Sequence, residues 1–297
     1  MVVSILSHMH IVVIGGTKFI GPHVVRQLAA HGHRVTVFHR GETEADLPSS
    51  VRHVHDPAST MPVTTFPKEL FEPAADVVIH MIPLGDGDAR AAMDAWRGRA
   101  QRLVALSSGD VYLAYGRFTG SEPGPIEKGP LHESSPLRNV LYPYRKRAQS
   151  TGDWMYAYEK ILVERAVLGD RSLEGVVLRL PKVYGTGENA DFATVHQFRH
   201  HPQWRWTHGY VENVAAAIVL AAIHPAARGQ IYNVGEEFTP TVESRLKDLP
   251  PSSLAPALSA EMNFEQDIVY DTGRIRRDLG YCEPVTYEEG LQKTSRG

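Results

Sequence analysis

A glycine-rich stretch near the N-terminus is the most constraining feature of this sequence. Residues 15–21 read Gly-Gly-Thr-Lys-Phe-Ile-Gly, between an apolar run at 10–14 and a segment of helical periodicity that begins at Pro22. The order of strand, glycine turn and helix is typical of a dinucleotide-binding turn. Glycine lets the backbone approach a pyrophosphate closely, and the helix N-terminus offers unpaired N–H groups to that anion. Lys18 stands where many such turns carry glycine, so the match is incomplete.

Short apolar runs alternate with segments of helical periodicity along most of the chain. We expect strands at 11–14, 35–38, 51–55, 77–81, 103–107 and 176–180. We expect helices at 22–31, 89–100, 156–168 and 271–280. This alternation predicts an α/β fold with a doubly wound parallel sheet, which binds ligands beyond the carboxyl ends of its strands. Two stretches, 119–151 and 239–263, have no clean periodicity, and we expect them to be irregular.

The bulk composition excludes several classes of protein. Apolar residues make up 42% of the 297 residues and charged residues 22%, which is ordinary for a globular chain with a sizeable core. No apolar run is long enough for a membrane span, and the N-terminus lacks the basic region of a signal peptide. The net charge of −3 gives no electrostatic footprint for nucleic acid. The single cysteine, Cys282, fits a reducing cytoplasm, so we expect a cytoplasmic protein without membrane or nucleic-acid partners.

The fifteen histidines of the chain raise the question of a metal site. His53 and His55 alternate on an expected strand, and His200 and His201 lie in an expected loop. No spacing repeats a known ligand pattern. We therefore expect each histidine to be solvated or part of the core, and no metal to be bound.

Three side chains form a candidate catalytic set. Ser108 directly follows the strand expected at 103–107, at the edge where active sites of open sheets lie. Tyr156 and Lys160 are four residues apart on the next expected helix, so they should share one face. A free phenol has a pKa near ~10, and a neighbouring ammonium lowers it. We expect Tyr156 to exchange a proton, Lys160 to tune it, and Ser108 to hold the substrate oxygen.

With these pieces in place, the chain resembles the extended short-chain dehydrogenase/reductase family, in its NAD(P)-dependent epimerase/dehydratase group. The resemblance covers nearly the whole chain, and its motifs occur in the family's order. They are Gly15–Gly21, Ser107-Ser108-x-x-Val111-Tyr112, Tyr156-x-x-x-Lys160 with Glu164, Leu178-Arg179-x-Pro181-x-Val183-Tyr184-Gly185, Tyr210-Val211-Glu212-Asn213-Val214-Ala215, Tyr232-Asn233-Val234-Gly235 and Tyr270-Asp271-Thr272. The first motif and Trp204-Arg205-Trp206-Thr207-His208-Gly209 resemble an atypical branch that includes chloroplast stem-loop-binding proteins.

The resemblance implies a Rossmann dinucleotide-binding domain at 9–180, completed by about 205–235, and a small substrate lobe at 181–204 and 236–297. It implies an oxidoreductase-type enzyme acting on a sugar or nucleotide-sugar. Hydride would pass between a substrate carbon and the nicotinamide, a step shared by oxidoreduction, epimerisation and dehydration. The alternative is a non-catalytic member of the same fold, either an RNA-binding protein or an NADP sensor. The acidic balance and the complete Ser108, Tyr156 and Lys160 set oppose this alternative.

The resemblance also assigns the cofactor site. NAD-specific members hold the adenosine ribose with an acid at the end of the second strand, but here that strand runs into Arg40 and no acid occurs before Glu42. Arg40 is suited to a 2′-phosphate and Lys18 adds positive charge, so we expect NADP before NAD. The expected cofactor-binding residues are Gly15, Gly16, Thr17, Lys18, Phe19, Ile20, Gly21, Arg40, Asp56, Met81, Tyr156, Lys160, Pro181 and Val183.

Two features of the middle of the chain complicate the assignment. The segment from Tyr142 to Lys146 repeats the Tyr-x-x-x-Lys spacing, but Pro143 disfavours a helix there, and only Tyr156 lies at a suitable distance from the next strand. The basic run 145–147 is either a solvated loop or a phosphate contact for a nucleotide-linked substrate. Because the stretch 186–203 is short for a substrate lobe, we expect few substrate contacts, or contacts donated by a second subunit of a homodimer.

Overall fold

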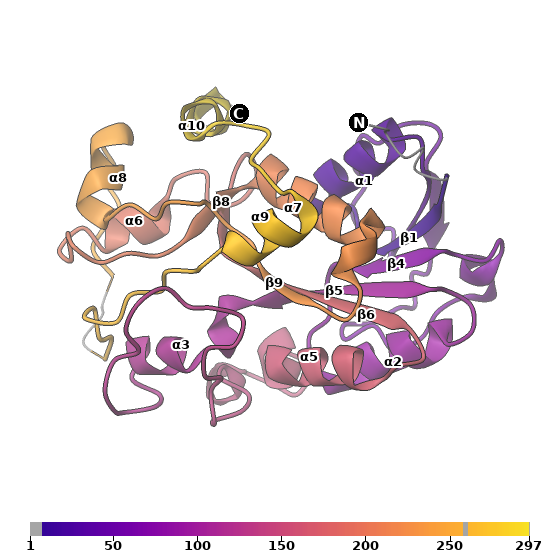
Figure 1. Cartoon of the computed structure of the whole chain (residues 1–297), viewed down its shortest axis with the longest axis horizontal. Coiled ribbons are helices and arrows are strands. Elements are labelled where there is room, and N and C mark those ends of the chain that lie inside the picture. Colours follow the sequence, from indigo (N-terminus) through magenta and orange to yellow (C-terminus); the bar gives the residue numbers. More distant parts are fainter. Residues whose placement is uncertain (1–7, 258–260, 297) are drawn as a thin grey trace.

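A seven-stranded parallel sheet forms the centre of the molecule, with strand order β3-β2-β1-β4-β5-β6-β9 (Figure 1). The computed structural model of the chain describes residues 8–257 and 261–296. The strands of the sheet are β1 (His10–Ile14), β2 (Arg34–His39), β3 (Arg52–His55), β4 (Val77–His80), β5 (Arg102–Ser108), β6 (Glu174–Leu180) and β9 (Ile231–Asn233). The strand order reverses between β1 and β4, and such a switch point opens a crevice at the carboxyl ends of the strands.

The side chains of the central strands alternate between two layers of helices. In β1, Ile11 and Val13 pack with α1 (Ile20–Ala30) and α7 (Val211–Ile223). Val12 and Ile14 point the other way, toward α2 (Asp86–Trp96) and α5 (Lys160–Gly169). Figure 1 shows the two pairs of helices on opposite faces of the sheet. Because both faces are covered, the inner strands β1 and β4 are almost continuous apolar runs in the sequence.

The predicted doubly wound sheet is confirmed, and the six predicted strands agree with β1 to β6 within one or two residues. The predicted helix at 22–31 corresponds to α1, and the one at 89–100 to α2. The one at 271–280 corresponds to α9 (Gly273–Leu279). Gly280 closes α9 with a φ of 68°, the left-handed conformation that glycine adopts without strain.

A third apolar cluster joins elements that follow β5 and β6 in the chain. Trp204 stacks on Phe118 at its centre, with ring centroids 4.7 Å apart and planes 15° from parallel. The remaining helices and strands are α3 (Leu113–Phe118), α4 (Trp154–Ala157), α6 (Ala193–Gln197), α8 (Val242–Asp248), α10 (Tyr287–Arg296), β7 (Lys182–Tyr184) and β8 (His208–Tyr210). Short 3₁₀ turns lie at Lys68–Phe71, Gly109–Val111, Arg145–Arg147 and Pro225–Ala227.

The two stretches expected to be irregular differ from each other. Within 119–151 the regular structure is one 3₁₀ turn, as expected. The expectation for 239–263 is wrong in part, because α8 lies inside it; residues 258–260 are outside the described part of the chain. The Thr241 hydroxyl caps α8 by accepting a hydrogen bond from the Ser244 N–H at 3.1 Å. Among the described residues, the helices are too short or too polar to cross a membrane.

Candidate active site

The glycine turn between β1 and α1 borders a pocket of about 220 Å³ at the carboxyl ends of β1 and β2. Gly15 has a φ of 81°, which L side chains rarely adopt. A Cβ on Gly21 would lie 2.6 Å from the carbonyl carbon of Gly16, so only glycine lets α1 pack this closely on the turn. The pocket is lined by Ile14, Gly15, Thr17, Lys18, Phe38, His39, Arg40, Glu42, Thr43, Ser59, Met61, Val63 and Ile82.

Four of the predicted cofactor residues line this first pocket. They are Gly15, Thr17, Lys18 and Arg40. The others predicted around it, which the pocket lining does not include, are Gly16, Phe19, Ile20, Gly21, Asp56 and Met81. Asp56 accepts a hydrogen bond from the Ala58 N–H at 3.0 Å, and the Met81 N–H donates to the Ile14 carbonyl at 3.0 Å. Their assignment to the cofactor stays a prediction.

Charge at the rim of the first pocket is partly balanced. The Arg40 guanidinium lies 2.7 Å from the Glu42 carboxylate, and both side chains are exposed. Lys18 stands on the glycine turn across the same pocket. An anion entering here therefore meets two cations, one of which already has an acidic neighbour.

A second pocket of about 250 Å³ lies where β5 and β6 end. Ser108 lines it, as does Pro181, whereas the lining does not include Val183. The full lining is Ser108, Gly109, Asp110, Tyr115, Tyr144, Trp154, Tyr158, Leu180, Pro181, Lys182, Trp206, Ile268 and Tyr270. Hydroxyl, carboxyl and aromatic groups therefore face one space at the predicted edge of the sheet.

Lys160 lies between the two pockets. Its buried ammonium donates hydrogen bonds to the carbonyl oxygens of Pro83, next to Ile82 of the first pocket, and of Leu106, two residues before Ser108 of the second. Burial lowers the pKa of Lys160 to about 8, although Asp110 and other carboxylates oppose the shift. Lys160 is therefore still an ammonium at neutral pH, and it loses its charge as the pH rises through about 8.

Tyr158 brings a phenol to Ser108 and Asp110 in the second pocket. Burial raises the pKa of Tyr158 well above its usual value, repulsion from Asp110 adds to the rise, and Ser108 acts against it. Burial also raises the pKa of Asp110, whose Oδ2 accepts a hydrogen bond from the Tyr144 hydroxyl at 2.8 Å. The other oxygen, Oδ1, is buried without a hydrogen-bond partner among the described residues.

Tyr156 lies apart from this group. Its side chain is exposed, the lining of the second pocket does not include it, and Arg145 lies over its ring at 4.6 Å from the centroid. The expectation of one helix over 156–168 is wrong, because α4 ends at Ala157 and α5 begins at Lys160. Tyr158 and Glu159 are extended between them, so Tyr156 and Lys160 do not share a helix face.

Sequence reasoning missed Tyr158, Asp110 and Tyr144, although two of them lie inside quoted motifs. Tyr158 is two residues after Tyr156, and Asp110 is two residues after Ser108. Tyr144 lies in the middle of the second Tyr-x-x-x-Lys segment, which runs from Tyr142 to Lys146. No α-helix forms at 142–146, as expected, although a 3₁₀ turn begins at Arg145, and this segment still supplies a side chain to the pocket.

The basic run 145–147 packs on aromatic rings. Arg145 lies over Tyr142 at 3.3 Å from the ring centroid, and Arg147 over Tyr144 at 4.7 Å. Such contacts hold a guanidinium in place while its N–H groups stay accessible. They are compatible with both expectations for this run, the solvated loop and the phosphate contact.

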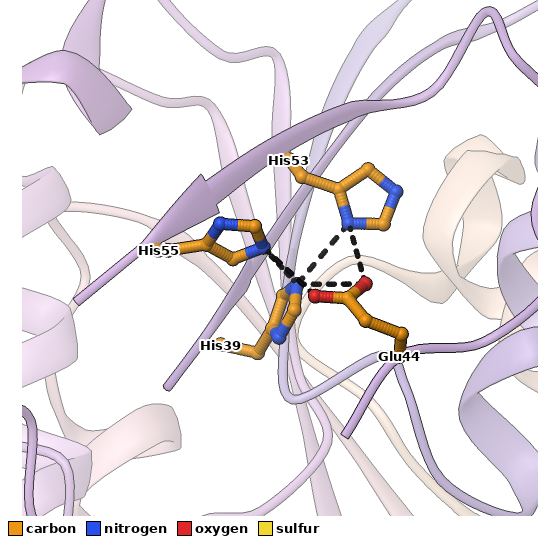
Figure 2. A group of neighbouring side chains, drawn as sticks. All are labelled: His39, Glu44, His53 and His55. Atoms are coloured by element: carbon orange, nitrogen blue, oxygen red, sulfur yellow. Dashed lines mark hydrogen bonds and ion pairs between the residues drawn. The ribbon is translucent and has the colours of Figure 1, made fainter. Parts of the chain in front are cut away.

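Three histidines from two neighbouring strands meet beside the first pocket. His39, at the end of β2, lies next to His53 and His55 of β3, and Glu44 completes the group (Figure 2). The sequence analysis, which found no spacing typical of metal ligands, did not predict this group. The signal available in the sequence was the period-two spacing of His53 and His55 beside a strand that itself ends in histidine.

The fold and the two pockets define an enzyme of the short-chain dehydrogenase/reductase type. The chain matches the model of the NAD dependent epimerase/dehydratase family over residues 11–235, and it belongs to that family. No curated protein sequence matches it.

Solved structures with the same fold include several sugar-nucleotide epimerases. An epimerase from Methanothermobacter thermautotrophicus is 16% identical with a TM-score of 0.71, covering 98% of this chain and 92% of its own. UDP-glucose 4-epimerase of Thermotoga maritima with UDP-glucose is 18% identical with a TM-score of 0.68, covering 97% and 98%. UDP-glucuronic acid 4-epimerase of Bacillus cereus, with UDP-glucuronic acid and NAD, is 15% identical with a TM-score of 0.67, covering 97% and 98%.

Proposed function

We propose that this enzyme binds NAD(P) in the first pocket and acts on a nucleotide-sugar in the second by reversible hydride transfer. The observation that carries the proposal is the position of Lys160, whose ammonium bonds backbone carbonyls beside both pockets. Family membership and the NAD and UDP-sugar bound by similar structures support the same assignment. Which net reaction follows the hydride step depends on the substrate.

The residues around the glycine turn fit a dinucleotide. Gly15 and Gly21 leave no room for side chains, so the backbone would present its N–H groups to the pyrophosphate at the start of α1. Lys18 and Arg40 would meet the phosphate of the adenosine ribose, which supports NADP as the first choice. Once bound, the nicotinamide supplies the chemistry of accepting or returning a hydride.

In the second pocket, we assign proton exchange to Tyr158 and its neighbours. In the oxidising direction the substrate C–H bond breaks and its electron pair leaves with the hydride. The hydroxyl proton passes to the Tyr158 oxygen as the Tyr158 proton passes to Asp110, whose raised pKa favours its acceptance. Ser108 would orient the substrate oxygen. In the reducing direction each proton returns along the same path.

The family motif assigns the same proton to Tyr156, and that role stays a prediction. Tyr156 would have to leave Arg145 and enter the pocket from α4 to perform it. Tyr158 already lines the pocket with Ser108, and Lys160 lies 5.3 Å from the centroid of its ring. The position of the ring is the reason for preferring Tyr158.

The proposal is tested first by measuring cofactor binding and then by searching for a substrate that the enzyme converts. Fluorescence titration with NADPH and NADH should give saturable binding that Lys18→Ala weakens. A screen of UDP-sugars and sugar alcohols should then reveal substrate-dependent change of nicotinamide absorbance, or formation of an epimer. Absence of any cofactor binding in the folded protein would overturn the proposal.

A further inference from the structure

Three imidazoles and one carboxylate converge on a single point between β2 and the edge strand β3 (Figure 2). The His39 Nε2 atom lies 3.1 Å from Nδ1 of His53 and 3.0 Å from Nε2 of His55. The Glu44 carboxylate lies 3.2 Å from His55, 3.7 Å from His53 and 4.0 Å from His39. The four ligand atoms all lie within 4.8 Å of one another.

Backbone pairing brings these residues together. In the parallel register of β2 and β3, His39 lies opposite His55, and His53 is two residues earlier on the same face of β3. Glu44 comes from the loop that follows β2. The three histidines are therefore held by the sheet, and the carboxylate is brought by a loop.

The Glu44 carboxylate can accept a proton from His55 Nε2 at 3.2 Å, yet hydrogen bonds do not satisfy every contact of the group. The Gly41 N–H donates to His39 Nδ1 at 3.2 Å, so the proton of a neutral His39 is on Nε2. That nitrogen faces two other ring nitrogens but has a single N–H to give. One of the two contacts is then left without a proton between its nitrogens. A cation at the centre would accept a lone pair from each ring.

The spacing of the ligand atoms agrees with a tetrahedral metal. With Zn–N bonds of about 2.0–2.1 Å, tetrahedral geometry separates neighbouring ligand atoms by about 3.3–3.4 Å. The separations quoted above run from 3.0 to 4.0 Å, with either Glu44 oxygen as the nearer atom, and the widest separation in the group stays within 4.8 Å, so a small inward movement of the side chains would reach this value. Four protein ligands fill a tetrahedron, which is typical of structural rather than catalytic zinc.

We propose that His39, His53, His55 and Glu44 bind a divalent transition metal, with zinc as the best-fitting ion. Ligation through Nε2 places the His39 proton on Nδ1, so the Gly41 amide would turn away from it. The metal would also tie Glu44 to β2 and β3. Both ends of the loop from Arg40 to Thr43 would then be set by the metal.

This loop connects the metal site to the first pocket. An effect of the metal on cofactor binding rests on the proposed function, which places the cofactor in that pocket. His39, Arg40, Glu42 and Thr43 all line that pocket. A loop that is fixed beforehand loses less conformational freedom when a ligand binds. Zinc should therefore tighten cofactor binding by about fivefold or more, the lower end of typical coupling between two sites.

Metal binding is tested first, on untagged full-length protein stripped with a chelator and then desalted. Isothermal titration with Zn²⁺ should give one site per chain, and Co²⁺ should give the strong visible absorption of tetrahedral coordination. Losing a metal's outer-shell partner costs about 10- to 100-fold in affinity, so His53→Ala, which removes a direct ligand, should cost at least about 100-fold. Glu44→Gln, on an exposed loop, tests the same site without risk to folding.

The control is His200→Ala, which removes an exposed histidine outside the group and should leave Zn²⁺ affinity unchanged. Failure to bind one Zn²⁺ per chain would overturn the proposal. So would equal binding by Glu44→Gln and the unaltered chain, or equal losses in His53→Ala and His200→Ala. Titration of NADPH with and without Zn²⁺ then tests the connection: equal affinities would overturn it. Absence of cofactor binding under both conditions would count against the proposed function instead.

Discussion

The Arg138 guanidinium and the Glu159 carboxylate form an almost completely buried ion pair, with 3.1 Å between Nη2 and Oε1. Arg138 belongs to the irregular segment 119–151, and Glu159 precedes the helix that begins with Lys160. Glu159 also accepts hydrogen bonds from the N–H groups of Ile161 and Tyr142. One carboxylate therefore fixes the long segment to the start of α5, beside the second pocket.

We expect Glu159→Ala to lower the free energy of unfolding by about 3–5 kcal/mol, because it leaves the Arg138 charge buried without its partner. Urea unfolding monitored by circular dichroism measures this change. Asp86→Ala, which breaks an exposed ion pair with Arg90, is the matched control and should barely move the midpoint. A loss no larger than that of the control would contradict the role given to Glu159.

The two tyrosines on either side of Ala157 should differ in their effect on catalysis. Tyr158→Phe should lower turnover by about 10² to 10⁴, the usual worth of a positioned proton donor, with little change in cofactor affinity. Tyr156→Phe and Tyr142→Phe should stay within a few-fold of the unaltered enzyme. Steady-state rates with the first substrate identified measure these effects. A large loss of turnover in Tyr156→Phe and a small one in Tyr158→Phe would assign proton exchange to the motif residue Tyr156.

Cofactor preference should depend on the balance between Arg40 and Glu42. We expect NADPH to bind at least several-fold more tightly than NADH, and Arg40→Asp to reverse the order, because it replaces the cation near the 2′-phosphate with an acid. Glu42→Gln should strengthen the preference by freeing the guanidinium from its partner at 2.7 Å. Fluorescence titration measures all three proteins, and equal affinities in the unaltered chain would remove the argument for NADP.

Cofactor affinity should fall as the pH rises through about 8. Lys160 is a predicted cofactor-binding residue beside the first pocket, and its pKa is lowered to about 8. Its ammonium, which would attract the cofactor, is present below that pH and is lost above it. Lys160→Met has no proton to lose at this position, and the corresponding step should be missing from its profile. Titrations of NADPH between pH 6.5 and 9.5, roughly 1.5 units on each side of the pKa, give the comparison. An identical step in both proteins would assign it to another group.

The inner strands were predictable because burial on both faces makes them almost continuous apolar runs, as in β1 and β4. The helix over 156–168 was predicted wrongly because Tyr158 and Glu159 leave the helical conformation for tertiary partners. Glu159 bonds to Arg138 from the segment 119–151, and Tyr158 lies against Ser108 from the end of β5. Local periodicity carries no information about such distant partners.

For the same reason, only those parts of the candidate site that lie in local motifs were predicted. Ser108, Lys160 and the glycine turn lie in local motifs, and the structure places them at the two pockets or between them. Tyr144 and the histidine group depend on which segments become neighbours. His39 and His55 meet only because β2 pairs with β3, and the sequence indicates this pairing without giving its register. The division into a nucleotide-binding domain and a substrate lobe stays a prediction.

The two outermost strands of the sheet are β3 and β9, with four and three residues. An edge strand this short offers few unpaired backbone N–H and C=O groups to another chain. Short edge strands therefore protect the sheet against edge-to-edge aggregation. Two molecules would gain little by joining their sheets edge to edge. If the enzyme works as a homodimer, helices or loops must provide the contact.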